Sequence, residues 1–217
     1  QRAALASKGD HPHLLVMSAT PIPRTLALMI YGDLDISVLD ELPPGRQKID
    51  TYAITGEKRQ RAFRFIKKHI DAGFQCYIIC PMIDDGQNDM ASVISYTQQV
   101  KEEWLVGYSV GMLHGRMKAK EKESVMNEFS HGRLSVLIST TVVEVGVDVP
   151  NAVIMMIENA ERYGLSQLHQ LRGRVGRGKE KSTCILVSDA QNEESVTRMK
   201  TMCTTSDGFQ IADQDLK

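Results

Sequence analysis

The stretch LSVLISTTVVEVGVDVPNAVIMMI, residues 134–157, decides the fold of this chain. It holds two short, mostly apolar runs, 134–139 and 152–157, separated by a polar turn at GVDVP. Short runs that are apolar at most positions, without alternation, are typical of strands buried on both faces of a parallel sheet. Comparable runs occur at 14–18, 35–39, 49–54, 76–80, 108–113 and 183–188. The sequence therefore predicts an α/β fold with a mostly parallel central sheet and helices on both faces.

Helical spacing appears in the segments between these runs. The segment 57–71 carries apolar residues at that spacing: Ala62, Phe63, Ile66 and Ile70. A second helix is expected at about 118–129, with Val125, Met126 and Phe129 turned inward. Beyond Ser188 the polar sequence predicts a helix at about 192–204, a turn at SDG and the start of another helix. The segment ELPPGRQK, residues 41–48, is the best linker in the chain.

Composition narrows the class of protein. With 217 residues, 42% hydrophobic content and a net charge of −1, the chain fits one domain with attachments and not a membrane protein or a strongly basic DNA-coating protein. Nucleic-acid contacts must therefore be local. The four cysteines show no CxxC pair, and three of them lie in or beside apolar runs, so they are expected to pack as small hydrophobes in a reducing cytoplasm. Because Gln1 is not a start methionine, we expect a piece of a longer protein.

The clearest chemical motif is QLHQLRGRVGRG, residues 167–178. It places Arg174 and Arg177 three residues apart among three glycines. A guanidinium offers a fork of donors that matches phosphate oxygens, and small neighbours allow a close approach of backbone to ligand. On spacing alone, a flexible basic loop that touches any anion remains an alternative.

Two further motifs follow predicted strands. In STTVVEVGVDVPNA, residues 139–152, Thr140 and Thr141 could donate to a phosphate, and Asp148 could accept from a ribose hydroxyl or orient an arginine. The alternative there is an ordinary capped turn. In LHGRMKAKEK, residues 113–122, a strand end meets a helix start, which suits a backbone phosphate. The residues at that junction are His114, Gly115 and Arg116.

Together with SATPIPRT at 18–25, these motifs occur in an order that closely resembles the later motifs of superfamily 2 helicases, and of the RecG-like family in particular. The resemblance also covers DELPPGR at 40–46, CYIICPMI at 76–83 and DGFQIADQDL at 207–216, and so spans nearly the whole chain. It implies a RecA-like three-layer lobe, the second of two that clamp ATP between them. It further implies a bacterial, cytoplasmic, ATP-driven translocase on double-stranded DNA that remodels stalled forks and Holliday junctions.

The resemblance assigns roles to individual residues. Gln170, Arg174 and Arg177 would face ATP, with Arg177 the better candidate for an arginine finger. The nucleotide side would also include Gly146 and Asp148, and the DNA backbone would lie near His114, Gly115, Arg116, Thr140 and Thr141. Ser18, Ala19 and Thr20 match the motif that couples ATP state to lobe movement. ATP and Mg²⁺ would be bound mainly by a first lobe, whose phosphate loop and acidic metal site have no counterpart here.

The same resemblance predicts the domain organisation. Residues 1–45 would be the remnant of the first lobe with its linker, 46–190 the second lobe, and 191–217 the start of a helical hairpin that converts lobe motion into movement along duplex DNA. Partners would be branched duplex DNA, the first lobe and a DNA-binding wedge domain. The N-terminal segment, without its parent sheet, could also mediate a non-native oligomer through strand or helix exchange. The fragment alone is expected to be inactive.

Three alternatives stay open at this point. A transcription-repair coupling factor translocase shares segments like SATPIPRT and QLRGRVGR, although DELPPGR and GVDVPNA fit RecG better. An RNA helicase of the same superfamily shares the SAT motif and a related arginine motif. A nucleic-acid-binding module without turnover is the third, and the presence of Gln170, Asp148 and both arginines counts against it.

Overall fold

A computed structural model describes residues 47–80, 89–140 and 148–215, together with five isolated positions at 15, 17, 35, 37 and 39. Several predicted features lie outside these residues, among them most of the strands expected at 14–18 and 35–39. The site candidates Ser18, Ala19, Thr20, Thr141 and Gly146 also lie outside them.

One six-stranded sheet organises the described part of the chain. Its strands are β1 (Asp50–Ile54), β2 (Gln75–Ile79), β3 (Val110–Leu113), β4 (Val136–Ser139), β5 (Ala152–Ile157) and β6 (Thr183–Val187). They run in the order β1-β6-β5-β2-β4-β3, and every pairing is parallel. The predicted strands at 49–54, 76–80, 108–113, 134–139, 152–157 and 183–188 are therefore confirmed, with ends shifted by one or two residues.

Alternate side chains of the strands build two separate cores. Tyr77, Leu137 and Met155 belong to one, and their neighbours Cys76, Ile138 and Met156 to the other. Residues of both sets are buried, because each face of the parallel sheet is covered by helices. This explains why the strands read as continuously apolar.

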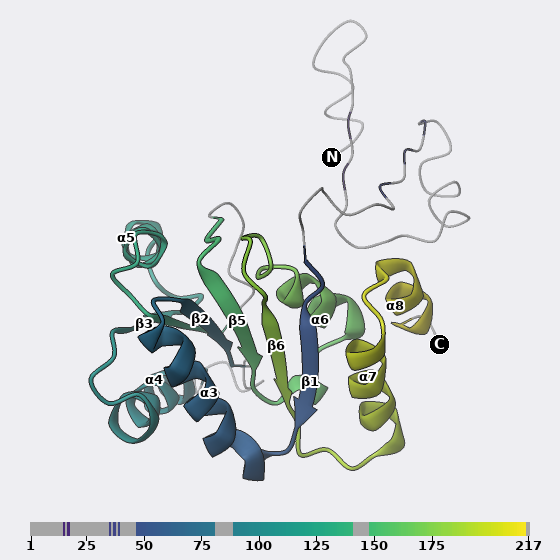
Figure 1. Cartoon of the computed structure of the whole chain (residues 1–217), viewed down its shortest axis with the longest axis horizontal. Coiled ribbons are helices and arrows are strands. Elements are labelled where there is room, and N and C mark those ends of the chain that lie inside the picture. The colour runs from purple at the N-terminus through teal and green to yellow at the C-terminus, as the bar shows by residue number, and fades with distance from the viewer. Residues whose placement is uncertain are drawn as a thin grey trace, which may run out of the picture.

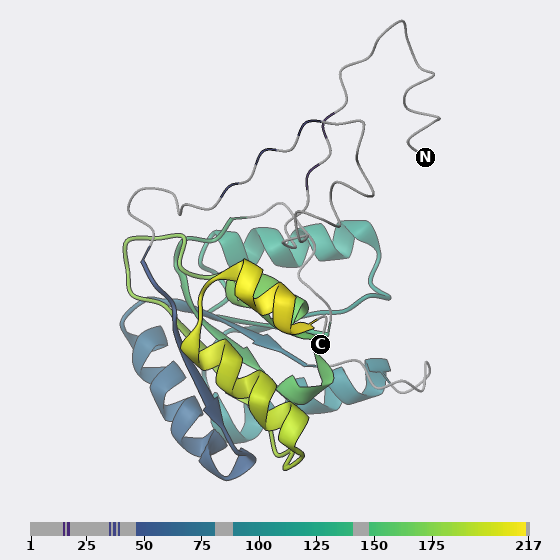
Figure 2. The same ribbon diagram turned by 90° about the vertical axis from the view of Figure 1, so that its right-hand side faces the viewer.

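Helices cover the sheet on both sides (Figure 1). The first core includes residues from α5 (Ala119–Ser130), α6 (Leu165–Arg172), α7 (Glu193–Thr204) and α8 (Gly208–Asp215). The second core includes residues from α3 (Arg59–Asp71) and α4 (Asp89–Gln99), and from the π-helical turn η2 (Val100–Trp104). Figure 2 shows α7 and α8 on the side of β1 opposite to α3. The fold is the RecA-like αβα lobe that the sequence predicted.

The predicted helices are largely as expected. The segment 57–71 forms the 3-10 turn η1 (Gly56–Lys58) and α3, with the four predicted apolar residues buried. In α5 Met126 and Phe129 are buried, whereas Val125 is only partly so. The sequence did not predict the helices α4 and α6 or the 3-10 turn η3 (Ala160–Arg162). The helix α4 is only weakly amphipathic, and in α6 the apolar spacing of Leu165, Leu168 and Leu171 overlaps the arginine motif. Among the described residues no helix is long and apolar enough to cross a membrane.

Candidate functional site

The predicted site residues divide between the two ends of the strands. His114, Gly115 and Arg116 directly follow β3, and Thr140 directly follows β4, so these four lie at the carboxyl edge of the sheet. Asp148 precedes β5, and Arg174 and Arg177 lie on the loop between α6 and β6. They lie at the amino edge, because α6 starts after β5 and its chain must return before β6 runs in the same direction.

The loop after α6, residues 173–182, brings the candidate nucleotide residues together. The Nη1 atom of Arg177 lies 3.4 Å from Oδ1 of Asp148, and both side chains are substantially exposed, at 34% and 54%. Arg177 also donates from Nε to the carbonyl of Gly173 at 3.4 Å, a long hydrogen bond. Asp148 thus contacts an arginine, one of the two roles considered for it. The exposed guanidinium keeps donors available to an anionic ligand.

Arg174 and Gln170 are half-buried, whereas Arg177 is exposed. Gln170 lies on α6, about one turn before Arg174. Both arginines also act on Tyr77 of the central strand β2. Burial raises the pKa of Tyr77 to about 12, and the positive charges of Arg177 and Arg174 act in the opposite direction. The arginine loop is thus electrostatically coupled to the centre of the sheet.

Two glycines allow the loop to pack this tightly. Gly176 has a φ of +76°, and a Cβ there would lie 2.9 Å from Cγ1 of Ile49. At Gly178 a Cβ would lie 2.7 Å from the carbonyl oxygen of Pro150, the loop residue before β5. A side chain at Gly176 would displace the Ile49 side chain, and one at Gly178 would displace the Pro150 backbone, so both glycines are needed for this close packing of the loop. Gln47 secures the far end of the loop by donating from its side chain to the carbonyl of Lys179 at 2.8 Å.

Arg172, inside the same motif, is a functional residue that the sequence reasoning missed. It is 3% exposed and donates from Nη1 to the carbonyls of Met202 at 2.8 Å and Thr205 at 3.0 Å. These carbonyls belong to the C-terminal end of α7, so Arg172 ties the base of the arginine loop to that helix. Burial lowers the pKa of Arg172 from its ordinary value. The only feature of the sequence that points to burial of Arg172 is the apolar residue directly before it, Leu171.

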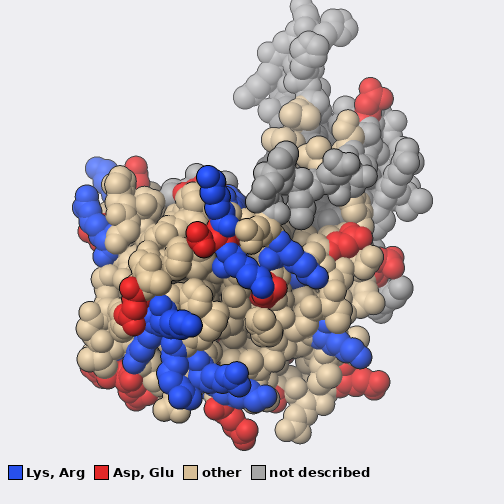
Figure 3. All heavy atoms as spheres, in the orientation of Figure 1, with Lys and Arg blue, Asp and Glu red and all other residues tan. Residues whose placement is uncertain are grey.

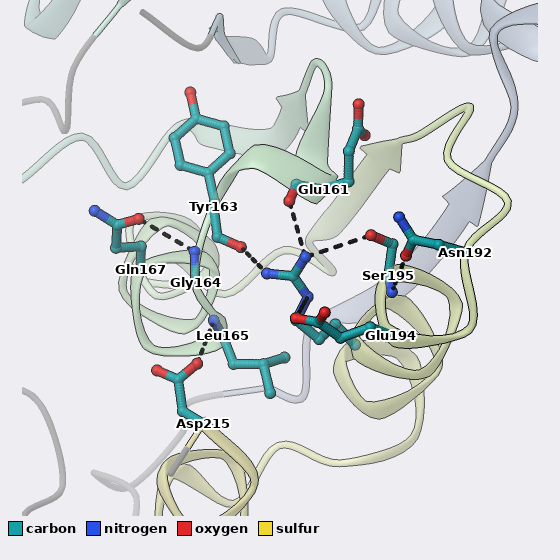
Figure 4. Close-up of polar contacts among 10 residues, drawn as sticks. Glu161, Tyr163, Gly164, Leu165, Gln167, Asn192, Glu194, Ser195 and Asp215 are labelled. Carbon is teal, nitrogen blue, oxygen red and sulfur yellow. Dashed lines mark hydrogen bonds and ion pairs between the residues drawn. The ribbon is translucent and has the colours of Figure 1, made fainter. Parts of the chain in front are cut away.

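The N-terminus of α6 is held by α8. The carboxylate of Asp215 accepts from the backbone N–H of Leu165 at 3.0 Å (Figure 4). It also accepts from the backbone N–H of Ser166 at 3.1 Å and from the Ser166 hydroxyl at 2.7 Å. Burial would raise the pKa of Asp215, but these hydrogen bonds outweigh it and hold the pKa below its ordinary value. Gln167 completes the end by accepting from the N–H of Gly164 at 3.2 Å. An acceptor fifty residues away therefore caps α6.

A third contact ties α7 to the turn before α6. Arg198 donates to the carbonyls of Tyr163 at 3.3 Å and Glu161 at 3.1 Å, and it touches the Ser195 hydroxyl at 3.4 Å (Figure 4). Together with Arg172 and Asp215, it attaches both ends of α6 to the two C-terminal helices. Displacement of α7 and α8 therefore has a direct route to the arginine loop.

The carboxyl edge presents the candidate DNA residues. Gly115 and Arg116 are exposed on the turn between β3 and α5. His114 is half-buried, and its Nδ1 is buried without a hydrogen-bond partner. Thr140 is 5% exposed, and its N–H donates to the Leu113 carbonyl at 3.3 Å, which joins the two strand ends. In this group Arg116 is the exposed cation that can reach an anionic backbone.

At the carboxyl end of β5, a buried carboxylate that the sequence did not predict holds two helices against the sheet. Glu158, which follows β5, is 4% exposed. It accepts two hydrogen bonds from Arg59 of α3, at 3.0 and 2.9 Å, and one from the Tyr96 hydroxyl of α4 at 2.7 Å. The hydrogen bond to Glu158 raises the pKa of Arg59, and burial raises that of Tyr96. This cluster holds two helices against one strand end.

Within the three described segments, no group of three or more His, Cys, Asp or Glu side chains could hold a metal ion. The donors of the arginine loop fit a different ligand. Two guanidinium groups, one of them exposed, suit phosphate oxygens, and the nearby carboxylate of Asp148 suits a hydroxyl or an arginine.

Comparison with known proteins identifies the class. Residues 57–179 match the model of the helicase conserved C-terminal domain, and the chain belongs to this family. Domain 2 of the DEAD-box helicase Mss116p, in a structure bound to an RNA duplex, has the same fold with a TM-score of 0.57 and 17% identity over 73% of this chain and 62% of that one.

More specific similarity is to RecG helicases, as the motif order predicted. The chain is 48% identical to the ATP-dependent DNA helicase RecG of Synechocystis and 47% identical to that of Bacillus subtilis, over its whole length but only 26% and 32% of theirs. A structure of RecG bound to a three-way DNA junction matches 93% of this chain and 26% of that one, with a TM-score of 0.81 and 44% identity. The chain thus spans about a third or less of these relatives.

Proposed function

We propose that this chain is the second motor lobe of an ATP-dependent translocase that acts on double-stranded, branched DNA such as stalled forks and Holliday junctions. The observation that carries the proposal is the arginine loop, where Arg177 is exposed beside Asp148 and the half-buried Arg174 lies three residues before it. The names of the relatives support it, since each is an ATP-dependent DNA helicase. The two lobes would work together with a wedge domain of the same protein in the bacterial cytoplasm.

The arginine loop fits the phosphates of ATP, and Arg177 and Arg174 would contact them from this side of the cleft. When bound, ATP supplies the phosphoryl group that is transferred to water. Arg177 would neutralise charge at the phosphate oxygens, Asp148 would orient Arg177, and Gln170 would support the same face. Mg²⁺ and most of the nucleotide contacts would belong to the first lobe, so the 217-residue chain alone is inactive. Gly146 is proposed for the nucleotide side, next to Asp148.

For DNA, we propose that Arg116 and Gly115 contact the backbone, with His114, Thr140 and Thr141 shaping the same edge of the sheet. Residues 1–45, including Ser18, Ala19 and Thr20, would close the first lobe and transmit its state. Residues 191–217 would begin a helical hairpin, and the hydrogen bonds of Arg172 to the end of α7 and of Asp215 on α8 to the start of α6 would connect such a hairpin to the arginine loop. The orphan N-terminal segment could mediate a non-native oligomer. A monomer at high concentration in light scattering would rule that out.

The decisive experiment measures ATP hydrolysis by the full-length protein with forked DNA. Removing an arginine finger typically costs 10³–10⁵-fold in rate, so Arg177→Ala is expected to lower turnover by roughly 10³-fold. Lys179→Ala, two residues further along the same loop, is the matched control and should change turnover less than about threefold, because an exposed lysine outside the arginine pair adds little. Turnover unaffected by Arg177→Ala would overturn the proposal. Competition between DNA forks and structured RNA would separate a DNA motor from an RNA helicase.

A further inference from the structure

A groove of about 610 Å³ lies at the β1 end of the sheet, between α3 and the strands β1 and β6. One wall is a stripe of α3 and the turn before it, which includes Lys58, Arg61 and Phe65. The other wall carries Tyr52 of β1 and Lys181, the second residue before β6. We call this the β1–α3 groove. The proposed nucleotide and DNA residues do not line it.

Two aromatic side chains stand open in the groove. Tyr52 is 55% exposed and Phe65 is 37% exposed, although both belong to regular elements of a well-packed lobe. On the other face β1 is covered by α7, and toward the groove α3 leaves the outermost strand uncovered. Phe65 is held in place by the ring of His69, with ring centroids 4.2 Å apart. Both rings are therefore accessible on the same groove, where they offer apolar surface that a ligand can cover.

The charge around the groove is positive in a chain whose net charge is −1. Residues 57–71 contain six Lys or Arg against two Asp or Glu. Of these cations Arg59 is occupied by Glu158, whereas Lys58, Arg61, Arg64 and Lys68 are exposed. Figure 3 shows the Lys and Arg side chains gathered over α3. This local surplus is the electrostatic footprint of a polyanion.

We propose that the β1–α3 groove binds a segment of single-stranded nucleic acid. Open aromatic rings beside cations are the arrangement that binds unpaired strands, because bases stack on the rings while the cations meet the phosphates. A duplex would gain less, since its base faces are already covered by neighbouring pairs. This inference rests on the proposed function in one respect, since an unpaired arm of the branched DNA would supply the single strand.

The groove is separate from the proposed duplex contacts. The β1 strand lies at one end of the sheet and β3, followed by His114–Arg116, at the other. With strands about 4.8 Å apart, five spacings separate them by about 24 Å, more than the reach of a single side chain. An unpaired arm in the groove and a duplex at the carboxyl edge could therefore be held at the same time.

The groove also contains a negative charge, at Asp50, and removing it should change the affinity in the opposite direction to the other substitutions. Asp50 lines the groove and forms an ion pair with Lys181 at 2.8 Å. Its carboxylate repels phosphates and occupies the lysine that faces α3. Asp50→Asn should therefore tighten binding, whereas loss of a cation or a ring should weaken it.

The test measures fluorescence anisotropy of a labelled 12-nucleotide oligo(dT) with the 217-residue chain. We expect Arg61→Glu and Tyr52→Ala each to weaken binding about tenfold, because the first reverses a charge that meets the phosphates and the second removes a ring on which a base stacks. Arg64→Glu is the matched control: Arg64 is an exposed arginine of the same helix that does not line the groove, and its loss should change binding less than about twofold. Asp50→Asn should strengthen binding by about twofold or more. Circular dichroism melts would show that each variant is folded.

Other outcomes would overturn the proposal. One is an equal loss of oligo(dT) affinity in Arg61→Glu and Arg64→Glu, which would indicate diffuse charge attraction. Another is an unchanged oligo(dT) affinity in Tyr52→Ala. Preference for an acidic peptide of the same net charge over oligo(dT) would assign the groove to a protein instead. A duplex of the same length reports the carboxyl edge, where Arg116→Ala and not Arg61→Glu should matter. The ATPase test of Arg177→Ala is independent of all these results, so the two proposals can fail separately.

Discussion

The two edges of the sheet are built in different ways. At the carboxyl edge, one buried carboxylate, Glu158, fastens α3 and α4 through Arg59 and Tyr96. At the amino edge, the arginine loop is shaped by glycines and by hydrogen bonds from α6 to the C-terminal helices. The first arrangement is compact and charge-based, and all its members are internal to the lobe. The second is spread over several elements, because contacts from α6 to α7 and α8 and the close approach of the loop to Ile49 and Pro150 all shape it.

The largest loss of stability at either edge is expected when the buried carboxylate is removed. Glu158→Ala leaves the Arg59 guanidinium and the Tyr96 hydroxyl without their acceptor, and removing one partner of a buried pair typically costs 3–5 kcal/mol. Because Arg59 remains 27% exposed and can reach water, we expect a loss at the low end, about 3 kcal/mol, in urea unfolding of the chain. Glu123→Ala on the exposed face of α5 is the control and should be nearly neutral. A loss below about 1 kcal/mol would contradict the assigned role.

The next largest effect is expected at Arg172. Arg172→Met keeps the apolar stem but removes the hydrogen bonds to Met202 and Thr205, each a charged donor to a buried carbonyl. We expect about 2 kcal/mol of destabilisation. Hydrogen exchange should rise at the C-terminal end of α7 and on the arginine loop, and not in α3. Uniform exchange across the lobe would show that Arg172 is only a packing residue.

A smaller effect should follow from a side chain on the arginine loop. Gly176→Ala forces a left-handed backbone on alanine and brings its Cβ against Ile49, so about 1.5 kcal/mol of stability should be lost. The control is Gly115→Ala, since Gly115 has no positive φ and no atom within 4 Å of an added Cβ, and it should be almost neutral. Equal effects of the two changes, by thermal unfolding, would refute a special role for Gly176.

Sequence could predict the strands because burial on both faces leaves a continuous apolar signal, as in 134–139 and 152–157. It could also single out Arg174 and Arg177 from local spacing. It could not reveal that these arginines and His114 lie at opposite edges, because that depends on the return path of α6. Nor could it find Glu158 or Asp215, whose partners lie 62 to 99 and about 50 residues away. Such residues look like ordinary surface charges until the chain is folded.

The smallest effect, and the most specific test of how α8 holds α6, is expected at Asp215. Its pKa is lowered in the folded chain, so its contribution to stability is present above the ordinary pKa of about 3.9 and is lost as the pH falls through the lowered folded value. Asp215→Asn should cost less than about 1 kcal/mol at neutral pH, typical of an exposed helix cap. The cost should shrink toward zero in acid, where wild type loses the same charge. A cost that is constant with pH would mean that Asp215 acts through shape and not through its charge, and that α8 holds α6 by packing alone.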